Sequence, residues 1–137
     1  MFQCFVVRKR VKYLFLDIAS HQGCIACADD MSTVASVPCT SRIADHDLIA
    51  LIEQVLKQAA WSYQDLTHIA CVVGPGGFTS LRVAVTFTNV LADQLGIPAA
   101  GVHLSDLYGA RVPHSQFLWL HSTKKQELFA RSFGGGP

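Results

Sequence analysis

The sequence has 137 residues, of which 50% are apolar and 15% are charged, and its formal net charge is +1. This length and composition predict one folded domain and argue against a disordered chain, while the near-neutral charge argues against autonomous binding to RNA. Charged and polar residues interrupt every long apolar stretch, so no membrane helix is expected and the protein is predicted to be cytoplasmic.

Apolar periodicity predicts a run of three strands, followed by helices and strands in alternation. The expected strands cover residues 11–17, 24–28, 31–37, 66–73 and 99–102, and the expected helices cover residues 45–60, 80–95 and 105–110. A further strand pair is expected over residues 117–120 and 127–133. Asp29 and Asp30 are predicted to form the hairpin between the second and third strands, and Pro38 is predicted to end the third.

This order of elements predicts an α/β fold, the ribonuclease-H-like lobe of the actin and Hsp70 (ASKHA) architecture, with a mixed sheet and two main helices. The chain then divides into an N-terminal extension over residues 1–11, this lobe over residues 12–103 and a second lobe over residues 104–137. Because only two strands are predicted in the second lobe, it is expected to be incomplete.

A glycine-rich segment joins the predicted strand 66–73 to the second helix. It consists of Gly74, Pro75, Gly76, Gly77, Phe78, Thr79 and Ser80, followed by Leu81 and Arg82. It is not a Walker A loop, because no Lys followed by Ser or Thr is present. Two interpretations remain: a loop whose backbone N–H groups bind phosphate weakly, or a structural turn in which Thr79 or Ser80 caps the helix. The chemistry favours the turn.

Asp17 ends the first predicted strand, where this architecture places the carboxylate of a phosphate loop. The next residues, Ile18, Ala19 and Ser20, carry side chains where such a loop needs glycine. A turn or capping role is therefore favoured for Asp17, and no nucleotide cofactor is expected.

Histidines and cysteines offer two weaker metal hypotheses. His46 lies between two acidic residues and could approach His21, but a solvated first helical turn is the favoured interpretation. Cys24 and Cys27 are three apart in a predicted strand, so their side chains should point to opposite faces, and reduced thiols are expected. No metal site and no pairing of a catalytic nucleophile with a base is predicted.

The second helix carries two apolar faces. The first consists of Leu81, Ala84, Val85, Leu91, Ala92 and Leu95, and the second consists of Val83, Phe87 and Val90. One face is enough to cover a sheet, so the second is expected to bury against the helix over residues 45–60 or against another chain. The sequence leaves both alternatives open.

Several segments resemble the TsaB (YeaZ) family. GPGGFTSLR, at residues 74–82, is similar to the family signature GPGSFTGLR, and LFLDIAS, at residues 14–20, is similar to its opening ILAIDTS. Residues 45–52 resemble its H-x-x-x-L-x-x-x-I helix. The strand pair from Leu118 to Ala130 is similar to the strands that begin the second lobe of the family.

The resemblance implies a non-catalytic subunit in the synthesis of threonylcarbamoyladenosine on tRNA. Members of this family pair with the catalytic paralogue TsaD and work with the ATPase TsaE, and pairing uses two helices of the N-terminal lobe. Homodimerisation is an alternative. The partner surface is therefore expected to include Val83, Phe87 and Val90, together with His46 and Ala50 on the exposed side of the first helix.

The sequence also departs from the family pattern. Ala19 replaces a Thr or small polar residue, Gly77 replaces Ser, and Ser80 replaces Gly. The second lobe is shorter than in full-length members, which indicates a short form or a fragment. A glycoprotease-like peptidase and a small nucleotide-binding module remain as alternative functions.

Overall fold

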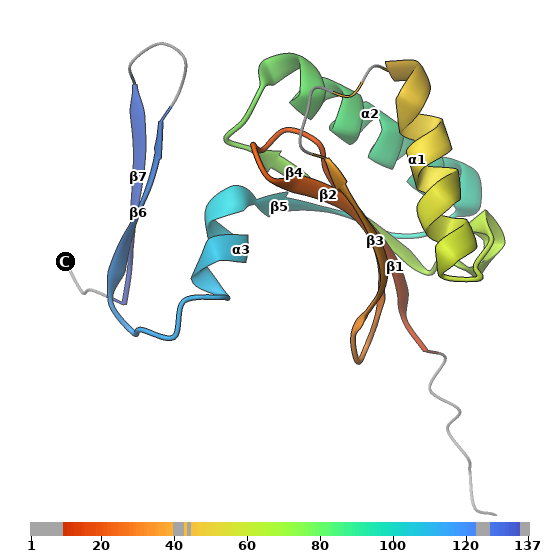
Figure 1. Ribbon diagram of the computed structural model, residues 1–137, viewed down its shortest axis with the longest axis horizontal. Helices are drawn as coiled ribbons and strands as arrows, with labels where there is room; N and C mark the ends of the chain where they lie inside the picture. Colours follow the sequence, from red (N-terminus) through yellow and green to blue (C-terminus); the bar gives the residue numbers. More distant parts are fainter. Residues whose placement is uncertain (1–9, 40–42, 44, 123–126, 135–137) are drawn as a thin grey trace, which may run out of the picture.

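The computed structural model describes residues 10–39, 43, 45–122 and 127–134, which form two sheets and three α-helices (Figure 1). The strands are β1 (Lys12–Asp17), β2 (Gly23–Asp29), β3 (Thr33–Cys39), β4 (His68–Gly74), β5 (Ala99–His103), β6 (Phe117–Ser122) and β7 (Leu128–Phe133). The helices are α1 (Asp45–Gln58), α2 (Phe78–Leu95) and α3 (Leu104–Gly109), with a short 3-10 turn at Tyr63–Asp65. Of the predicted N-terminal extension, only its last two residues lie within the described ranges.

The larger sheet has the strand order β3-β2-β1-β4-β5. Its first three strands form an antiparallel meander, whereas β4 runs parallel to both β1 and β5. Alternating helices and strands explain the parallel half, because parallel neighbours need a crossover connection. The predicted mixed sheet with two main helices is confirmed.

Helices α1 and α2 cover one face of this sheet (Figure 1). The apolar residues at alternate strand positions point toward them, and each helix contributes its inner stripe. The fully buried members of this core are Leu14, Leu16, Ile25, Cys27, Ile52, Val55 and Ile69.

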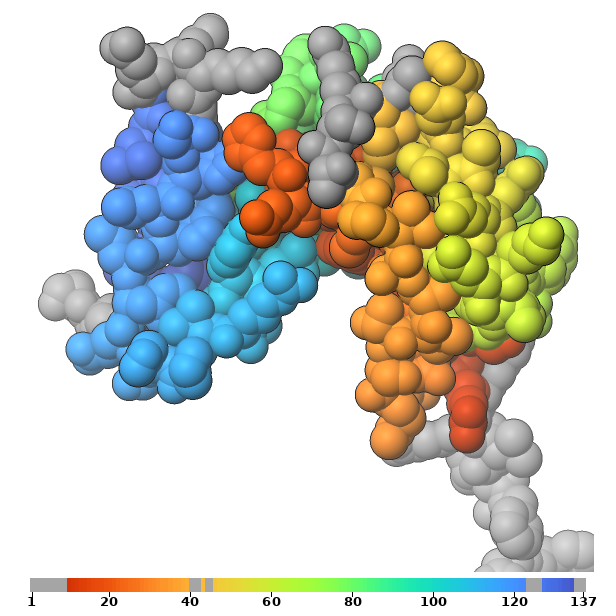
Figure 2. Space-filling model, viewed as in Figure 1, coloured from red at the N-terminus to blue at the C-terminus, as the bar shows by residue number. Residues whose placement is uncertain are grey.

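On the opposite face, α3 lies beside β4 and β5, and the hairpin of β6 and β7 stands to one side of the sheet (Figure 1). Here a smaller cluster forms around Val72, Leu104 and Trp119, with Phe117 and Phe133 packed against it. Figure 2 shows the hairpin and α3, in blue, as a block to one side of the strands and helices coloured red to green. This second block therefore contacts the rest of the chain over a small area.

Two predicted boundaries of β3 are wrong. The strand begins at Thr33 because the Asp29 side chain accepts hydrogen bonds from the backbone N–H groups of Met31 and Ser32, which extends the turn beyond two residues. It also continues past Pro38 to Cys39. Because β3 is an edge strand, Pro38 can leave its missing donor on the unpaired side.

The start of α2 also differs from the prediction. The helix begins at Phe78, two residues before the expected start, and its N-cap is Gly77, which makes no side-chain capping bond. Thr79 and Ser80 are therefore inside the helix, and neither is the N-cap. None of the helices in the described part of the chain is long and apolar enough to cross a membrane.

Candidate functional site

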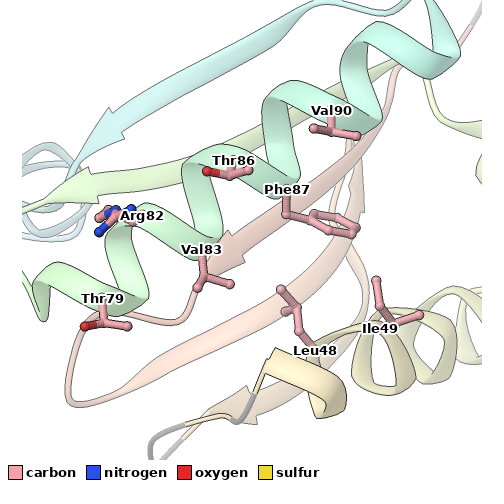
Figure 3. A pocket seen from close by; sticks show the side chains of 8 residues that line it. All are labelled: Leu48, Ile49, Thr79, Arg82, Val83, Thr86, Phe87 and Val90. Atoms are coloured by element: carbon pink, nitrogen blue, oxygen red, sulfur yellow. The ribbon is translucent and has the colours of Figure 1, made fainter.

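A groove of about 570 Å³ runs between α1 and α2 on the outer side of the helical layer (Figure 3). Its lining residues are Leu48, Ile49, Thr79, Arg82, Val83, Thr86, Phe87 and Val90. In Figure 3, Val83 and Phe87 of α2 point toward Leu48 and Ile49 of α1. The two helices therefore leave a hollow whose walls are mostly apolar.

The groove follows from residue spacing along α2. Thr79, Val83, Phe87 and Val90 are three or four positions apart, so they form one stripe about three turns long. The inner stripe of the same helix, which includes Ala84 and Ala92, is buried against the sheet. The predicted second apolar face of α2 is thus present and faces away from the strands.

One alternative for the second apolar face, burial against α1, is confirmed in part, and the other, burial against another chain, stays a prediction. Val83 and Phe87 are half-buried and pack against the same core as α1, so the molecule covers some of this face itself. Val90 keeps 57% of its surface exposed, and Ile49, across the groove, keeps 43% exposed. Apolar surface therefore remains at the groove for another molecule to cover.

The structure places the predicted partner residues in two groups. Val83, Phe87 and Val90 line the groove, whereas His46 and Ala50 are exposed on α1 and are not among the lining residues. The α1 wall is made by Leu48 and Ile49 instead. The sequence could have indicated Ile49 as a groove residue, because it is an apolar residue just outside the buried stripe of α1.

One charged residue, Arg82, lines the groove. Its guanidinium lies 5.5 Å from the centroid of the Phe78 ring, a cation–π contact, and Phe78 itself is 73% exposed. Among the described residues, no carboxylate forms a salt bridge with Arg82. The groove therefore presents a cation next to apolar surface.

The glycine-rich loop packs against the end of the first strand. The Gly77 N–H donates a hydrogen bond to the Ala19 carbonyl over 3.3 Å. A Cβ on Gly76 would lie 2.8 Å from the same oxygen, and Gly74 has φ 135°, which only glycine adopts readily. These contacts support the structural-turn interpretation of Gly74, Gly76 and Gly77, because one of the N–H groups that could face an anion is already bonded.

Asp17 is a turn residue, as predicted. Its side chain is buried and accepts hydrogen bonds from the Ser20 backbone N–H at 3.1 Å and from the Ser20 hydroxyl at 2.5 Å. The carboxylate is thus used to close the turn after β1.

The two weaker metal hypotheses concerned His46 and the cysteines of β2. His46 is exposed in the first turn of α1, with its Nε2 atom 3.4 Å from an oxygen of Asp47, as the solvated-turn interpretation predicts. Cys27 is buried in the core, and burial raises the pKa of its thiol to about 11. Across the described ranges, no group of three His, Cys, Asp or Glu side chains is placed to hold a metal.

Sequence reasoning missed a polar cluster that joins α3 to the hairpin. The Nδ1 atom of His103 is 2.7 Å from the hydroxyl of Ser105, and the Arg131 guanidinium donates to the same hydroxyl at 2.7 Å. Arg131 also forms a 2.7 Å salt bridge with Asp106. Ser105 is fully buried, so this serine–histidine pair fastens β7 to α3 and offers no accessible nucleophile.

A protein-family model matches residues 39–130, and its description is "TsaD: tRNA N6-adenosine threonylcarbamoyltransferase". The chain belongs to this family. The match includes α1, the glycine-rich loop, α2 and most of the hairpin.

Curated relatives of two kinds match within the TsaD family. The tRNA threonylcarbamoyladenosine biosynthesis protein TsaB of Buchnera aphidicola subsp. Acyrthosiphon pisum is 24% identical over 126 residues, which cover 86% of this chain and 57% of that protein. The tRNA N6-adenosine threonylcarbamoyltransferase of Shouchella clausii is 39% identical over 54 residues, which cover 39% of this chain and 16% of that protein. The predicted resemblance to TsaB is confirmed, and the chain spans little more than half the length of that TsaB relative.

Solved structures match over a larger part of the chain. YeaZ from Pseudomonas aeruginosa superposes with a TM-score of 0.63 at 18% identity, covering 90% of this chain and 67% of that one. A second structure, titled as an uncharacterized protein with similarity to peptidase YEAZ from Pseudomonas aeruginosa, gives a TM-score of 0.64 at 19% identity, covering 88% and 63%. These matches confirm the ASKHA-like fold.

Proposed function

We propose that the chain is a non-catalytic scaffold subunit in the biosynthesis of threonylcarbamoyladenosine on tRNA, pairing with a TsaD-type protein in the cytoplasm. The groove between α1 and α2 is the pairing surface. A TsaE-type ATPase joins the same complex, and the chain itself contributes neither a cofactor nor a membrane contact.

The observation that carries this proposal is the mostly apolar groove between α1 and α2. Its walls are α1 and α2, the two helices that cover the five-stranded sheet. The side chains of Ile49 and Val90, which line the groove, are about half exposed to solvent. Apolar residues in such a position are stabilised when a second protein covers them. The name of the TsaB relative, a tRNA threonylcarbamoyladenosine biosynthesis protein, indicates the process in which a partner for the groove should be sought.

A scaffold role is also supported by the hydrogen bonds of the polar groups in the loops and beside α3, because these bonds stabilise the fold. The Asp17 carboxylate closes the turn after β1, and the Gly77 N–H, in the loop before α2, donates to the Ala19 carbonyl of that turn. The buried Ser105 is held by His103 and Arg131, which argues against the glycoprotease-like alternative. These residues support the structure that positions the groove.

The test is co-purification of the chain with the TsaD-type protein of the same organism. We expect wild type to form a stable complex, and Phe87→Asp to weaken it by at least about 100-fold, because the new carboxylate would have to be desolvated at the centre of the interface. Size-exclusion chromatography with light scattering measures the composition and mass of the complex.

The matched control is Leu120→Asp, which makes the same kind of change on an exposed apolar residue of β6. Val90→Asp provides a second groove variant, because Val90 is mostly exposed and its substitution leaves the core intact. If both groove variants bind like wild type while Leu120→Asp does not, the pairing surface is the hairpin and the proposal is wrong.

A further inference from the structure

One histidine is joined to the β6–β7 hairpin through a buried serine of α3. His103 is the N-cap of α3, and its Nδ1 atom accepts a hydrogen bond from the Ser105 backbone N–H over 3.3 Å. The same nitrogen lies 2.7 Å from the Ser105 hydroxyl oxygen, and the Arg131 guanidinium of β7 donates to that oxygen at 2.7 Å. Ser105 has no exposed surface, so solvent does not take the place of these partners.

The donors around this serine determine the protonation state of the histidine. A guanidinium only donates, so the Ser105 oxygen accepts from Arg131 and its single proton is left for the His103 Nδ1 atom. That nitrogen then faces two donors, the hydroxyl and the Ser105 backbone N–H, and must present a lone pair to them. The donor count therefore assigns a neutral His103 whose proton is on Nε2.

Protonation of His103 is incompatible with these contacts. An imidazolium carries N–H on both nitrogens and accepts nothing, so the Ser105 backbone N–H would lose its acceptor and α3 would lose its side-chain cap. The hydroxyl could turn to accept from Nδ1, but two cations, His103 and Arg131, would then meet at one oxygen. Asp106, which is 2.7 Å from Arg131, offsets part of this repulsion and none of the lost hydrogen bonds.

The charged and titratable side chains around His103 come from α3, β6 and β7. Those of the printed ring, ion-pair and hydrogen-bond contacts are Asp106, Tyr108, His121 and Arg131. Tyr108 and His121 contact the Trp119 ring, whose centroid lies 6.1 Å from that of His103. Histidine is the residue type of this group that changes charge between about pH 5 and pH 8, so His103 and His121 are the two candidates for a response to pH.

We propose that His103 is a pH-sensitive latch, which holds the hairpin on α3 when neutral and releases it when protonated. The closed form binds one proton fewer than the open form, so opening becomes more favourable as the pH falls. The larger sheet has a separate core under α1 and α2 and should stay folded when the hairpin is released. This inference is independent of the groove and of the partner proposed for it.

The first measurement is the tautomer of His103 in the full chain, read from the ring nitrogens by nitrogen-15 NMR at about pH 7.5. We expect a neutral ring with its proton on Nε2. A proton on Nδ1 would overturn the donor count and the latch with it. This measurement is made on wild type, so it tests the proposal even where a substitution disturbs folding.

The second measurement is amide hydrogen exchange at about pH 7.5 and about pH 5.5, corrected for the intrinsic effect of pH on exchange. We expect protection in β6 and β7 to fall about five- to tenfold at the lower pH, while protection in β1 and β4 stays within about twofold. One coupled proton allows at most about tenfold per pH unit below about pH 6.5, where an ordinary histidine takes up its proton.

His103→Asn separates the hydrogen bond from the titration. The amide oxygen of asparagine can cap α3 by accepting the Ser105 backbone N–H, and it does not change charge with pH. Protection in β6 and β7 should then stay within about twofold between the two pH values. His121→Asn is the matched control, because it makes the same change on the histidine that stacks on Trp119, and it should keep the wild-type fall.

Three exchange results would overturn the latch. Wild type could show equal protection of the hairpin at both pH values, or His103→Asn could keep the wild-type fall. An equal fall in β1 and β4 would mean that acid destabilises the whole molecule. Loss of the pH dependence in His121→Asn, with the wild-type fall kept in His103→Asn, would assign the response to His121.

Discussion

The five-stranded unit, which is the larger sheet with α1 and α2, and the β6–β7 hairpin both contain apolar strands but bury them to different extents. In the larger sheet, strands are covered on one face by α1 and α2, and residues such as Leu14 and Ile52 have no exposed surface. In the hairpin, Trp119 is buried against α3, whereas Leu118, Leu120 and Leu128 on the other side remain mostly exposed. Two strands covered on one face are only marginally stable in water.

The part of the molecule with the larger buried core also carries the groove. A partner that docks on α1 and α2 meets a surface already held by the main core. The hairpin depends instead on a few contacts, chiefly the packing of Trp119 and the hydrogen bonds of Arg131. Substitutions in the two regions should therefore differ in how much they lower the stability and in how much of the molecule they affect.

The largest effect is expected from Ile52→Ala, in the core beneath α1. Ile52 has no exposed surface, and removing its side chain should lower the free energy of unfolding by about 3 kcal/mol. Urea denaturation followed by circular dichroism measures it. Ile49→Ala, on the half-exposed side of the same helix, should cost less than about 1 kcal/mol, and equal losses would contradict the assigned faces.

A smaller loss is expected from Gly76→Ala in the glycine-rich loop. The added Cβ would lie 2.8 Å from the Ala19 carbonyl oxygen, so the loop must shift, at a cost of about 2 kcal/mol. Gly77→Ala is the control, because the nearest atom to its Cβ is 3.7 Å away, and it should cost about 0.5 kcal/mol as a poorer N-cap. Thermal unfolding of the two variants checks this difference, and the reverse order would be inconsistent with the packing.

Arg131→Met tests the hairpin directly. The change removes the hydrogen bond to Ser105 and the half-exposed salt bridge to Asp106, which together should stabilise the hairpin by about 1 kcal/mol. Amide exchange in β6 and β7 should accelerate about fivefold, while exchange in β1 and β4 stays unchanged. An equal acceleration in both sheets would mean that the hairpin unfolds only with the whole molecule. Arg111→Met serves as the control.

The smallest effect is expected at the surface of the five-stranded unit. Hydrogen bonds from the Ser62 backbone N–H and hydroxyl, with Lys12 nearby, lower the pKa of the Asp65 carboxyl to about 2. Because the folded pKa is below the ordinary value of 3.8 for an aspartate, the stabilisation is present above pH 3.8 and is lost as the pH falls toward 2. An NMR titration of Asp65 should give a midpoint near 2, and a midpoint near 3.8 would contradict these contacts.

Most of the fold could be predicted because its signals are local. Short continuous apolar runs define β1 and β4, and the amphipathic spacing of residues 45–58 defines α1. The start of α2 was missed because a hydroxyl residue was expected at the N-cap, whereas the contact of Gly77 with Ala19 is made by residues far apart in the sequence. The end of β3 was also predicted wrongly, because Pro38 was expected to stop the strand. Only the order of strands in the sheet shows that β3 is an edge strand, which can contain a proline.

The candidate site was predictable on α2 and less so on α1. A second apolar stripe on one helix shows in the sequence, which is why Val83, Phe87 and Val90 were expected together. Which residues of α1 oppose them depends on how the two helices sit on the sheet, and this brings Leu48 and Ile49 to the groove. His46 and Ala50 are exposed outside the groove, and their place on a partner surface stays a prediction. The link from Arg131 to Ser105 spans 26 positions and left no sequence signal.

The most direct test of the central claim is amide hydrogen exchange of the chain, free and mixed with the TsaD-type protein, read by mass spectrometry. The account predicts slower exchange in the complex at the first turns of α1 and along α2 from Thr79 to Val90, with β6 and β7 unaffected. Protection confined to β6 and β7, with none at α1 or α2, would contradict it.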